Sequence, residues 1–329
     1  MKKLTTLLIA SLGLAALPAC GQPQHPSMIS FRVVDDLGAP VSDGEVKVST
    51  FSHWVPGEGF GRDEYDQRRA PLDKKGEVSF EVPNIRGDVE YAVYPKGKYY
   101  PVTMQSYRFK EVKNGRWEPW NPEVTVIMPR MLNPIALYAR KVGLMPRVKI
   151  PQSDKAGFDL MESDWVSPYG KGKRADLFFE YRTPVPMMDE AKAFECILAV
   201  TFANQGDGIL DYPAQPKRRL WELPRLAPAE GYEPKWSKTF GRSKEGGELI
   251  GYEREDQNYF FRIRTVLDPN GKVISALYGK IHGDIVFDAV RQIRFTYYLN
   301  PTSLDRNLEF DPKRNLFPNR MSGTNITEP

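Results

Sequence analysis

The strongest constraint on the fold is a period-two pattern of apolar side chains near the C-terminal end. In residues 259–267 and 293–299, apolar side chains alternate with mostly polar ones. A long strand over residues 273–288 is expected between them. A period of two places one set of side chains inward and the other outward on a half-buried sheet. Pro269 presets φ at a turn and Gly271 accepts positive φ, so a hairpin is predicted there.

Short segments of this kind, separated by turn residues, continue through the whole chain. The 28 prolines and 26 glycines are spread without a period, which favours many short strands over long helices. A length of 329 residues is enough for two domains with separate cores. The sequence therefore predicts an all-β protein with two β-sandwich domains over residues 28–130 and 157–329, joined by a connector over residues 131–156. The C-terminal domain is expected to be a sandwich or jelly-roll-like.

The N-terminus has the pattern of a targeting segment. Lys2 and Lys3 precede an apolar stretch over residues 4–17, which is shorter than the roughly 20 residues of a membrane span. The stretch ends in the sequence Leu-Pro-Ala-Cys at residues 17–20. Except for its proline, this sequence resembles the lipobox of bacterial lipoproteins, whose cysteine is acylated and becomes the mature N-terminus.

The resemblance implies that residues 1–19 are a signal peptide and that Cys20 carries a lipid anchor, with residues 20–27 as a tether. The other interpretation is an ordinary secretory peptide cleaved after Ala19. In Gram-negative lipoproteins, an aspartate directly after the acylated cysteine alters sorting. Here that position is Gly21, and the resemblance implies that the protein crosses the inner membrane and is held at the outer membrane. Two acyl chains would anchor it firmly, since one alone binds marginally.

The charge argues against nucleic-acid binding, and the cysteine content argues against a reactive thiol. Removal of residues 1–19 lowers the formal net charge from +4 to +2, because Lys2 and Lys3 are lost. With no basic run or base-stacking motif, no nucleic-acid partner is expected. If Cys20 is acylated, Cys196 is the only remaining thiol, and its place in an alternating strand predicts a buried core side chain.

The N-terminal domain resembles a known family. Residues 34–41, 44–48, 73–80 and 91–94 are similar to the carboxypeptidase regulatory-like domains. The resemblance implies a prealbumin-like β-sandwich related to the immunoglobulin architecture, which acts as a spacer or stabiliser beside another module.

One stretch of this domain departs from the family pattern. Residues 52–71 are expected to form a long loop, and loops of this length are often functional. The loop contains aromatic and basic side chains: His53, Trp54, Phe60, Tyr65, Arg62, Arg68 and Arg69. It is interpreted either as a loop packed on the neighbouring domain or as a site for an acidic partner or a sugar.

The C-terminal region also resembles a family of uncharacterised bacterial envelope lipoproteins. The similarity is carried by residues 157–165, 169–173, 275–281 and 305–311, and it spans nearly the whole mature chain. This resemblance implies no activity. Because only three histidines occur and no zinc, nucleophile-elbow or phosphate-loop motif is present, no catalytic residue, metal or cofactor is predicted.

Two sets of side chains are candidates for binding a ligand. Aromatic side chains of one long loop either stack on sugar rings or cover the sandwich edge: Trp221, Tyr232 and Trp236. Alternate residues of the long strand share one sheet face: Tyr278, Lys280, His282 and Asp284. This face is expected to be an ordinary wet surface, and the other interpretation is a polar recognition surface.

The sequence therefore favours an envelope-anchored binding or structural module. Its expected partners are a membrane, through the lipid anchor, and an envelope glycan or protein. The alternative is an envelope enzyme that acts on glycans through Asp159, Glu162 or Asp164, since paired carboxylates serve glycoside hydrolysis.

Overall fold

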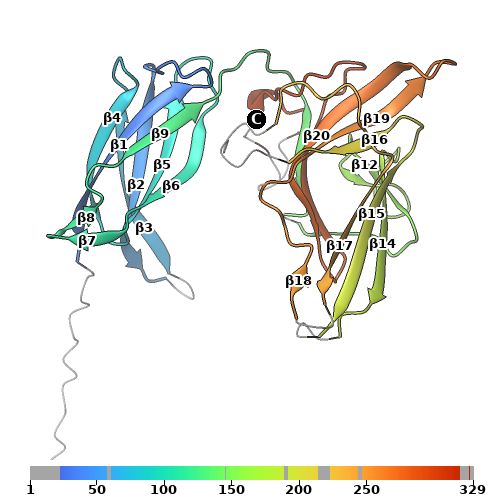
Figure 1. The fold of residues 1–329 in the computed structure, drawn as a ribbon, viewed down its shortest axis with the longest axis horizontal. Helices are drawn as coiled ribbons and strands as arrows, with labels where there is room; N and C mark the ends of the chain where they lie inside the picture. The colour runs from blue at the N-terminus through green and yellow to red at the C-terminus, as the bar shows by residue number, and fades with distance from the viewer. Residues whose placement is uncertain are drawn as a thin grey trace, which may run out of the picture. The chain divides into compact units, whose positions relative to one another are not determined.

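The computed structural model describes residues 23–57, 61–144, 146–188, 192–213, 223–243, 247–318 and 326. Within these ranges the named sheets are antiparallel, one short 3₁₀ helix lies at Pro312–Arg314, and no α-helix occurs. The predicted all-β fold is confirmed. The chain divides into two compact units (Figure 1). The first unit holds the described residues up to Gly97 together with Pro101–Ile127, and the second holds Lys98–Tyr100 and the described residues from Met128 onward.

The first unit is built from two sheets that share a core. Its strands are β1 (His25–Asp35), β2 (Gly44–Val55), β3 (Arg62–Pro71), β4 (Glu77–Asn84), β5 (Asp88–Pro95), β6 (Val102–Arg108), β7 (Glu111–Lys113), β8 (Arg116–Glu118) and β9 (Glu123–Met128). One sheet has the order β4-β1-β9 and the other β3-β2-β5-β6, while β7 and β8 pair separately. The ring of Phe31 on β1 lies 6.1 Å from that of Phe80 on the neighbouring β4 and 4.9 Å from that of Tyr91 on the facing sheet, measured between centroids.

The prediction of a long loop over residues 52–71 is wrong. β2 continues to Val55, and β3 pairs with it from Pro71 to Arg62. β2 pairs with β5 only over residues 44–49, so the β2–β3 hairpin continues past the rest of its sheet (Figure 1). Most β3 side chains are exposed, and an edge strand without a buried face shows no apolar alternation.

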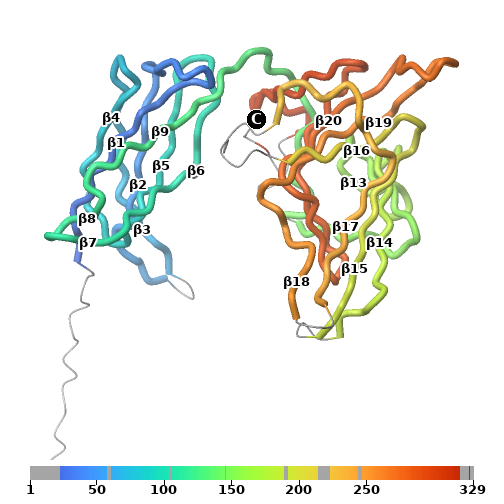
Figure 2. Tube along the Cα trace, viewed as in Figure 1, coloured from blue at the N-terminus to red at the C-terminus, as the bar shows by residue number. Residues whose placement is uncertain are grey.

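The second unit contains two larger sheets. Its strands are β10 (Tyr138–Val142), β11 (Val148–Lys149), β12 (Ala156–Asp159), β13 (Asp164–Trp165), β14 (Leu177–Val185), β15 (Phe194–Phe202), β16 (Gly208–Asp211), β17 (Lys235–Arg242), β18 (Leu249–Ile250), β19 (Tyr259–Leu267), β20 (Val273–Phe287) and β21 (Gln292–Leu299). The β19–β21 sheet has the order β10-β21-β20-β19-β16, with β11 on β21, and the β14–β15 sheet has the order β13-β12-β14-β15-β17-β18. Figure 2 traces the path of the chain through both sheets.

Aromatic side chains from both sheets meet in the core of this unit. Phe158 of β12 and Phe179 of β14 lie 5.8 and 6.1 Å from Phe295 of β21. Cys196 is 0% exposed in the same core, and burial raises the pKa of its thiol. Its predicted burial is confirmed.

Two segments that the sequence places outside the C-terminal domain belong to the second unit. Residues 131–156, expected to be a connector, contribute β10 and β11 to the β19–β21 sheet. Lys98–Tyr100 belongs here as well, because the Tyr100 backbone N donates to Pro129 O at 2.9 Å and its hydroxyl donates to Phe310 O at 3.0 Å.

The outer face of the β19–β21 sheet, which points away from the β14–β15 sheet, is largely covered. Phe260 and Tyr278 pack with Leu223 and Leu308, and Tyr298 packs with Phe310. The expectation of a wet face is therefore wrong over this region, because irregular segments from residues 223–227 and 308–310 lie on it.

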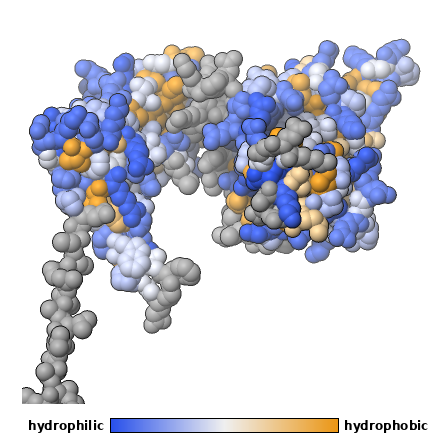
Figure 3. All heavy atoms as spheres, turned by 60° about the horizontal axis from the view of Figure 1, so that its bottom comes forward, coloured by the Kyte–Doolittle hydropathy of each residue, from blue (hydrophilic) through white to orange (hydrophobic). Residues whose placement is uncertain are grey.

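The visible surface is mainly polar. On the face drawn in Figure 3, hydrophilic side chains predominate and hydrophobic ones form small separate groups. In the part of the chain that the structure describes, no helix is long and apolar enough to span a membrane.

Candidate functional site

The predicted residues of β20 do not form a common surface. Tyr278 and Lys280 are 5% and 2% exposed. The Lys280 ammonium lies 4.6 Å from the centroid of the Tyr298 ring. Burial lowers the pKa of Lys280 to about 7, although the nearby Glu309 carboxylate opposes this change. Lys280 is thus part of the interior and not of an exposed recognition surface.

Glu309, beside Lys280, holds neighbouring segments together. Its carboxylate, 1% exposed, accepts hydrogen bonds from the backbone N of Leu132 at 2.7 Å and of Asn133 at 2.8 Å. The Tyr100 hydroxyl donates to it at 3.3 Å, and the Arg225 guanidinium lies 3.6 Å away. A buried carboxylate with this many donors is a structural feature, because its lone pairs are occupied by the fold itself.

Asp284 faces the opposite side of the sheet from Lys280. A bulge near Gly283, whose φ is +80°, interrupts the pairing of β20 with β21. The Asp284 carboxylate accepts from the Tyr259 hydroxyl at 2.7 Å and from the Lys238 ammonium at 2.5 Å. Since Tyr259 lies in the core and Lys238 comes from β17, Asp284 ties the two sheets to each other. The prediction that it shares a face with Lys280 is wrong, because strict alternation ends at the bulge.

The predicted aromatic platform is also turned inward where the structure describes it. The Tyr232 hydroxyl donates to Pro228 O at 2.7 Å, and the Arg262 guanidinium covers its ring at 4.9 Å. Trp236 packs on Tyr259, with their ring centroids 5.7 Å apart. Both side chains therefore cover the sandwich, as the simpler interpretation expected. Trp221 and Cys20 lie outside the described residues.

The three carboxylates of the enzyme hypothesis are engaged in turns. Asp159 accepts from four backbone N–H groups, those of residues 161, 162, 173 and 174, at 2.9 to 3.2 Å. Burial acts to raise its pKa, but these bonds lower it overall. Asp164 accepts from the backbone N of Trp165 and Lys171, and Glu162 pairs with Lys173. A proton donor for glycoside hydrolysis needs a raised pKa, which is the reverse of the change at Asp159.

A buried ion pair lies beneath this turn. The Arg264 guanidinium donates to both Asp176 oxygens at 2.7 and 3.0 Å and lies 3.5 Å from Asp159. Among the residues that the structure describes, no group of three or more histidine, cysteine, aspartate or glutamate side chains is placed to hold a metal ion.

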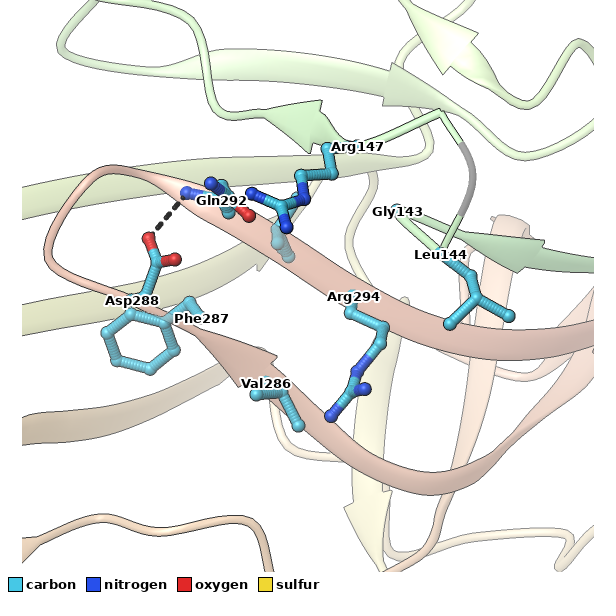
Figure 4. Close-up of a pocket in the computed structure, with 9 residues that line it drawn as sticks. Gly143, Leu144, Arg147, Val286, Phe287, Asp288, Gln292 and Arg294 are labelled. Carbon is cyan, nitrogen blue, oxygen red and sulfur yellow. Dashed lines mark hydrogen bonds between the residues drawn. The ribbon is translucent and has the colours of Figure 1, made fainter. Parts of the chain in front are cut away.

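An open hollow on the outer face, at the end of the β20–β21 hairpin, is a different kind of feature (Figure 4). Its volume is about 430 Å³, and its lining includes Leu144, Arg147, Val286, Asp288, Gln292 and Arg294. Figure 4 shows Arg147 extending toward Gln292, with Arg294 beside Val286 on the neighbouring strand. The hollow therefore combines two guanidinium groups, one amide and apolar walls.

Local backbone geometry places these side chains together. Gly143 has φ +78°, and a Cβ on it would lie 1.9 Å from Ile293 O. Only glycine allows the chain to turn this close to β21, which carries Arg147 alongside Arg294. Asp288 also lines the hollow, and one of its oxygens accepts from the backbone N of Val290 and Gln292 at 3.0 and 2.9 Å, which holds its carboxylate against the hairpin turn.

The guanidinium group of the hollow that is available to an anion is that of Arg147. Arg294 pairs with Glu253 at 2.5 Å, with both side chains about half exposed. Arg147 is exposed, and no acidic partner for it occurs within the described ranges. Lys141 of β10 lies on the same face of the sheet. It pairs with Thr296 of β21, which pairs on its other side with His282 of β20. Burial, with Lys280 and Lys141 nearby, lowers the pKa of His282 to about 4, so the imidazole is neutral at physiological pH.

Sequence reasoning found only part of this hollow. Arg294 belongs to the alternating strand over residues 293–299, but Arg147 lies in the stretch expected to be a connector. No local pattern links the two positions, because they meet only through the pairing of β11 and β10 with β21.

No family model matches the chain, and no curated protein matches it.

Proposed function

We propose that this chain is a lipid-anchored protein of the bacterial envelope that binds an acidic glycan in the hollow beside Arg147 and Arg294. Cys20 carries the anchor, the first unit acts as a spacer, and the second unit binds the ligand. The observation that carries the proposal is the pair of exposed guanidinium groups over apolar walls in an open hollow of about 430 Å³.

The chemistry of the hollow suits an acidic sugar better than a simple ion. Guanidinium groups bind carboxylates and phosphates through paired hydrogen bonds. The Gln292 amide offers a donor and an acceptor for hydroxyl groups. Leu144, 44% exposed, and Val286 supply apolar surface for the carbon face of a ring. The volume falls in the range of about 300–1,000 Å³ that is typical of small-molecule sites.

The engagement of Asp159 and Asp164 by backbone N–H groups argues against the enzyme alternative. A carboxylate with a lowered pKa that already accepts four hydrogen bonds is poorly suited to donate a proton to a leaving group.

The anchor is tested by replacing Cys20 with alanine in the full-length chain. We expect the variant to lose its association with membranes after cell fractionation, because no acyl chain can be attached. Unchanged membrane association of Cys20→Ala would refute the anchor.

The ligand site is tested with the full-length protein in detergent and two probes that differ only in charge. Tetragalacturonate is expected to bind, and its fully methyl-esterified form is not. Arg147→Gln and Arg294→Gln should each weaken binding by roughly tenfold, the usual loss for one partner of a charged hydrogen-bonded pair. Arg174→Gln, which changes an exposed arginine outside the hollow, is the matched control. Equal binding of the two probes, or a loss no larger than that of Arg174→Gln, would refute the proposal.

A further inference from the structure

The β2–β3 hairpin of the first unit carries a second candidate binding surface. Residues 50–55 of β2 and 62–66 of β3 pair only with each other, beyond the point where β2 leaves β5. We call this two-stranded part the arm. A two-stranded ribbon alone is only marginally stable in water, so specific contacts must hold the arm in shape.

A bulge gathers aromatic side chains on one face of the arm. Phe51 lies opposite Tyr65 and Trp54 lies opposite Asp63, with a register shift between Phe51 and His53. Tyr65 and Asp63 are two residues apart on β3 and so share a face. The extra residue on β2 therefore brings Phe51 and Trp54 to that same face, although regular alternation would separate them.

Arg86 stiffens this face from the turn between β4 and β5. Its guanidinium lies 3.3 Å from the centroid of the Phe51 ring. It also donates to both oxygens of Asp63, at 2.6 and 3.2 Å. Tyr65 packs edge-on against Phe51, with centroids 6.3 Å apart. The aromatic face is thus fixed by a stacked and doubly hydrogen-bonded arginine.

The outermost ring of the arm is both exposed and held in position. Trp54 is 55% exposed and Tyr65 is 38% exposed. Gly61 supports the Trp54 ring, since a Cβ on Gly61 would lie only 1.9 Å from its Cζ2 atom. Burial in a core does not account for a tryptophan that is held against backbone yet keeps half its surface in water. The two rings offer a ligand a fixed, flat apolar surface on which to stack.

We infer that the aromatic face formed by Trp54 and Tyr65, with the Arg86–Asp63 pair beside it, binds a neutral glycan by ring stacking. The flat faces of Trp and Tyr match the C–H face of a pyranose ring. The ion pair offers donors and acceptors to the hydroxyl groups at the rim of the sugar.

Charge balance favours a neutral ligand. Arg86 is neutralised by Asp63 at 2.6 Å, so the face has no excess charge to attract an ion. Addition of a protein strand to the free edge of β3 is opposed by its sequence, because exposed charged residues on an edge strand prevent such pairing.

The test uses the full-length protein in detergent with cellohexaose and chitohexaose as probes, measured by calorimetry. At least one of them should bind the unaltered protein. Trp54→Ala should weaken this binding by roughly tenfold or more, as expected for an aromatic residue at the centre of a binding surface, and Trp54→Phe should restore part of it. Tyr169→Ala, which removes an aromatic side chain that is 48% exposed in the second unit, should have no effect.

A second variant tests whether binding depends on the position of the Trp54 ring and not only on its presence. Gly61→Ala keeps every aromatic residue of the arm but displaces the Trp54 ring, so it should weaken binding with little change in the urea midpoint of the first unit. Failure of both probes to bind, or unchanged binding by Trp54→Ala, would overturn the inference. A Trp54-dependent dimer in sedimentation would overturn it in favour of a second copy of the chain. Arg294→Gln should leave this binding intact, so the outcome is independent of the acidic-glycan site.

Discussion

Replacement of Lys280 by methionine is expected to stabilise the second unit at neutral and mildly acidic pH. Lys280 is 2% exposed on β20, and methionine has a similar length without a charge to bury. The Tyr298 ring at 4.6 Å and the Glu309 carboxylate compensate only part of the desolvation cost, as the low pKa of the ammonium indicates.

The magnitude follows from the change in proton affinity. The pKa of Lys280 falls from 10.5 to about 7 on folding. Each tenfold change in proton affinity corresponds to about 1.4 kcal/mol, so burial of the charged form costs on the order of 5 kcal/mol. We expect roughly 2 to 5 kcal/mol of this to appear as stabilisation in Lys280→Met, since methionine also loses the contact of the ammonium with the ring.

The pH dependence has a definite sign. Because the pKa of Lys280 is lower in the folded state, the unfolded chain binds the proton more tightly, and the penalty is complete below about pH 7. It shrinks as the pH rises toward 10.5 and is absent above that value. The gain from Lys280→Met should therefore be largest at about pH 6 and should vanish near pH 10.5.

The assay is urea unfolding of the full-length protein at several pH values, followed by tryptophan fluorescence. Lys272→Met, at an exposed position near the start of the same strand, is the control and should change the free energy of unfolding by less than about 0.5 kcal/mol. Destabilisation by Lys280→Met of equal size at low and high pH would refute the reasoning. It would mean that the ammonium stabilises the fold through its partners.

Two further predictions concern the second unit. Gly143→Ala should destabilise it by more than Gly271→Ala, because both glycines have positive φ but only the first would bring a Cβ within 1.9 Å of Ile293 O; comparison of their urea midpoints tests this, and equal losses would contradict it. Asp176→Ala should cost roughly 3 to 5 kcal/mol, since it leaves the partly buried Arg264 guanidinium without its main partner. A loss below about 1 kcal/mol in the same assay would show that solvent reaches Arg264 freely.

Much of the fold could be predicted from the sequence. The alternation over residues 259–267 and 293–299 predicted strands that the structure contains as β19 and β21. The turn around Gly271 connects β19 to β20 as expected, and its φ is +81°. These predictions succeed because period-two patterning and turn chemistry are local properties.

The failures have physical reasons. β3 escaped recognition because its sequence is almost wholly polar, as suits an edge strand. Alternation assigned Lys280 to the outer face correctly, but it carries no information on whether distant segments cover that face. Asp284 was misplaced because a single bulge changes the direction of a side chain. The arginine pair of the hollow could not be predicted, since Arg147 and Arg294 are distant in sequence.

The membership of Lys98–Tyr100 in the second unit has a practical consequence. Neither unit corresponds to one uninterrupted stretch of polypeptide, so no single cut separates them cleanly. A truncated chain that starts at Met128 would remove Tyr100 and deprive Glu309 and the Phe310 carbonyl of a hydrogen-bond donor. A version of the second unit that is expressed alone must therefore include Lys98–Tyr100. Any replacement of the first unit must keep the same three residues.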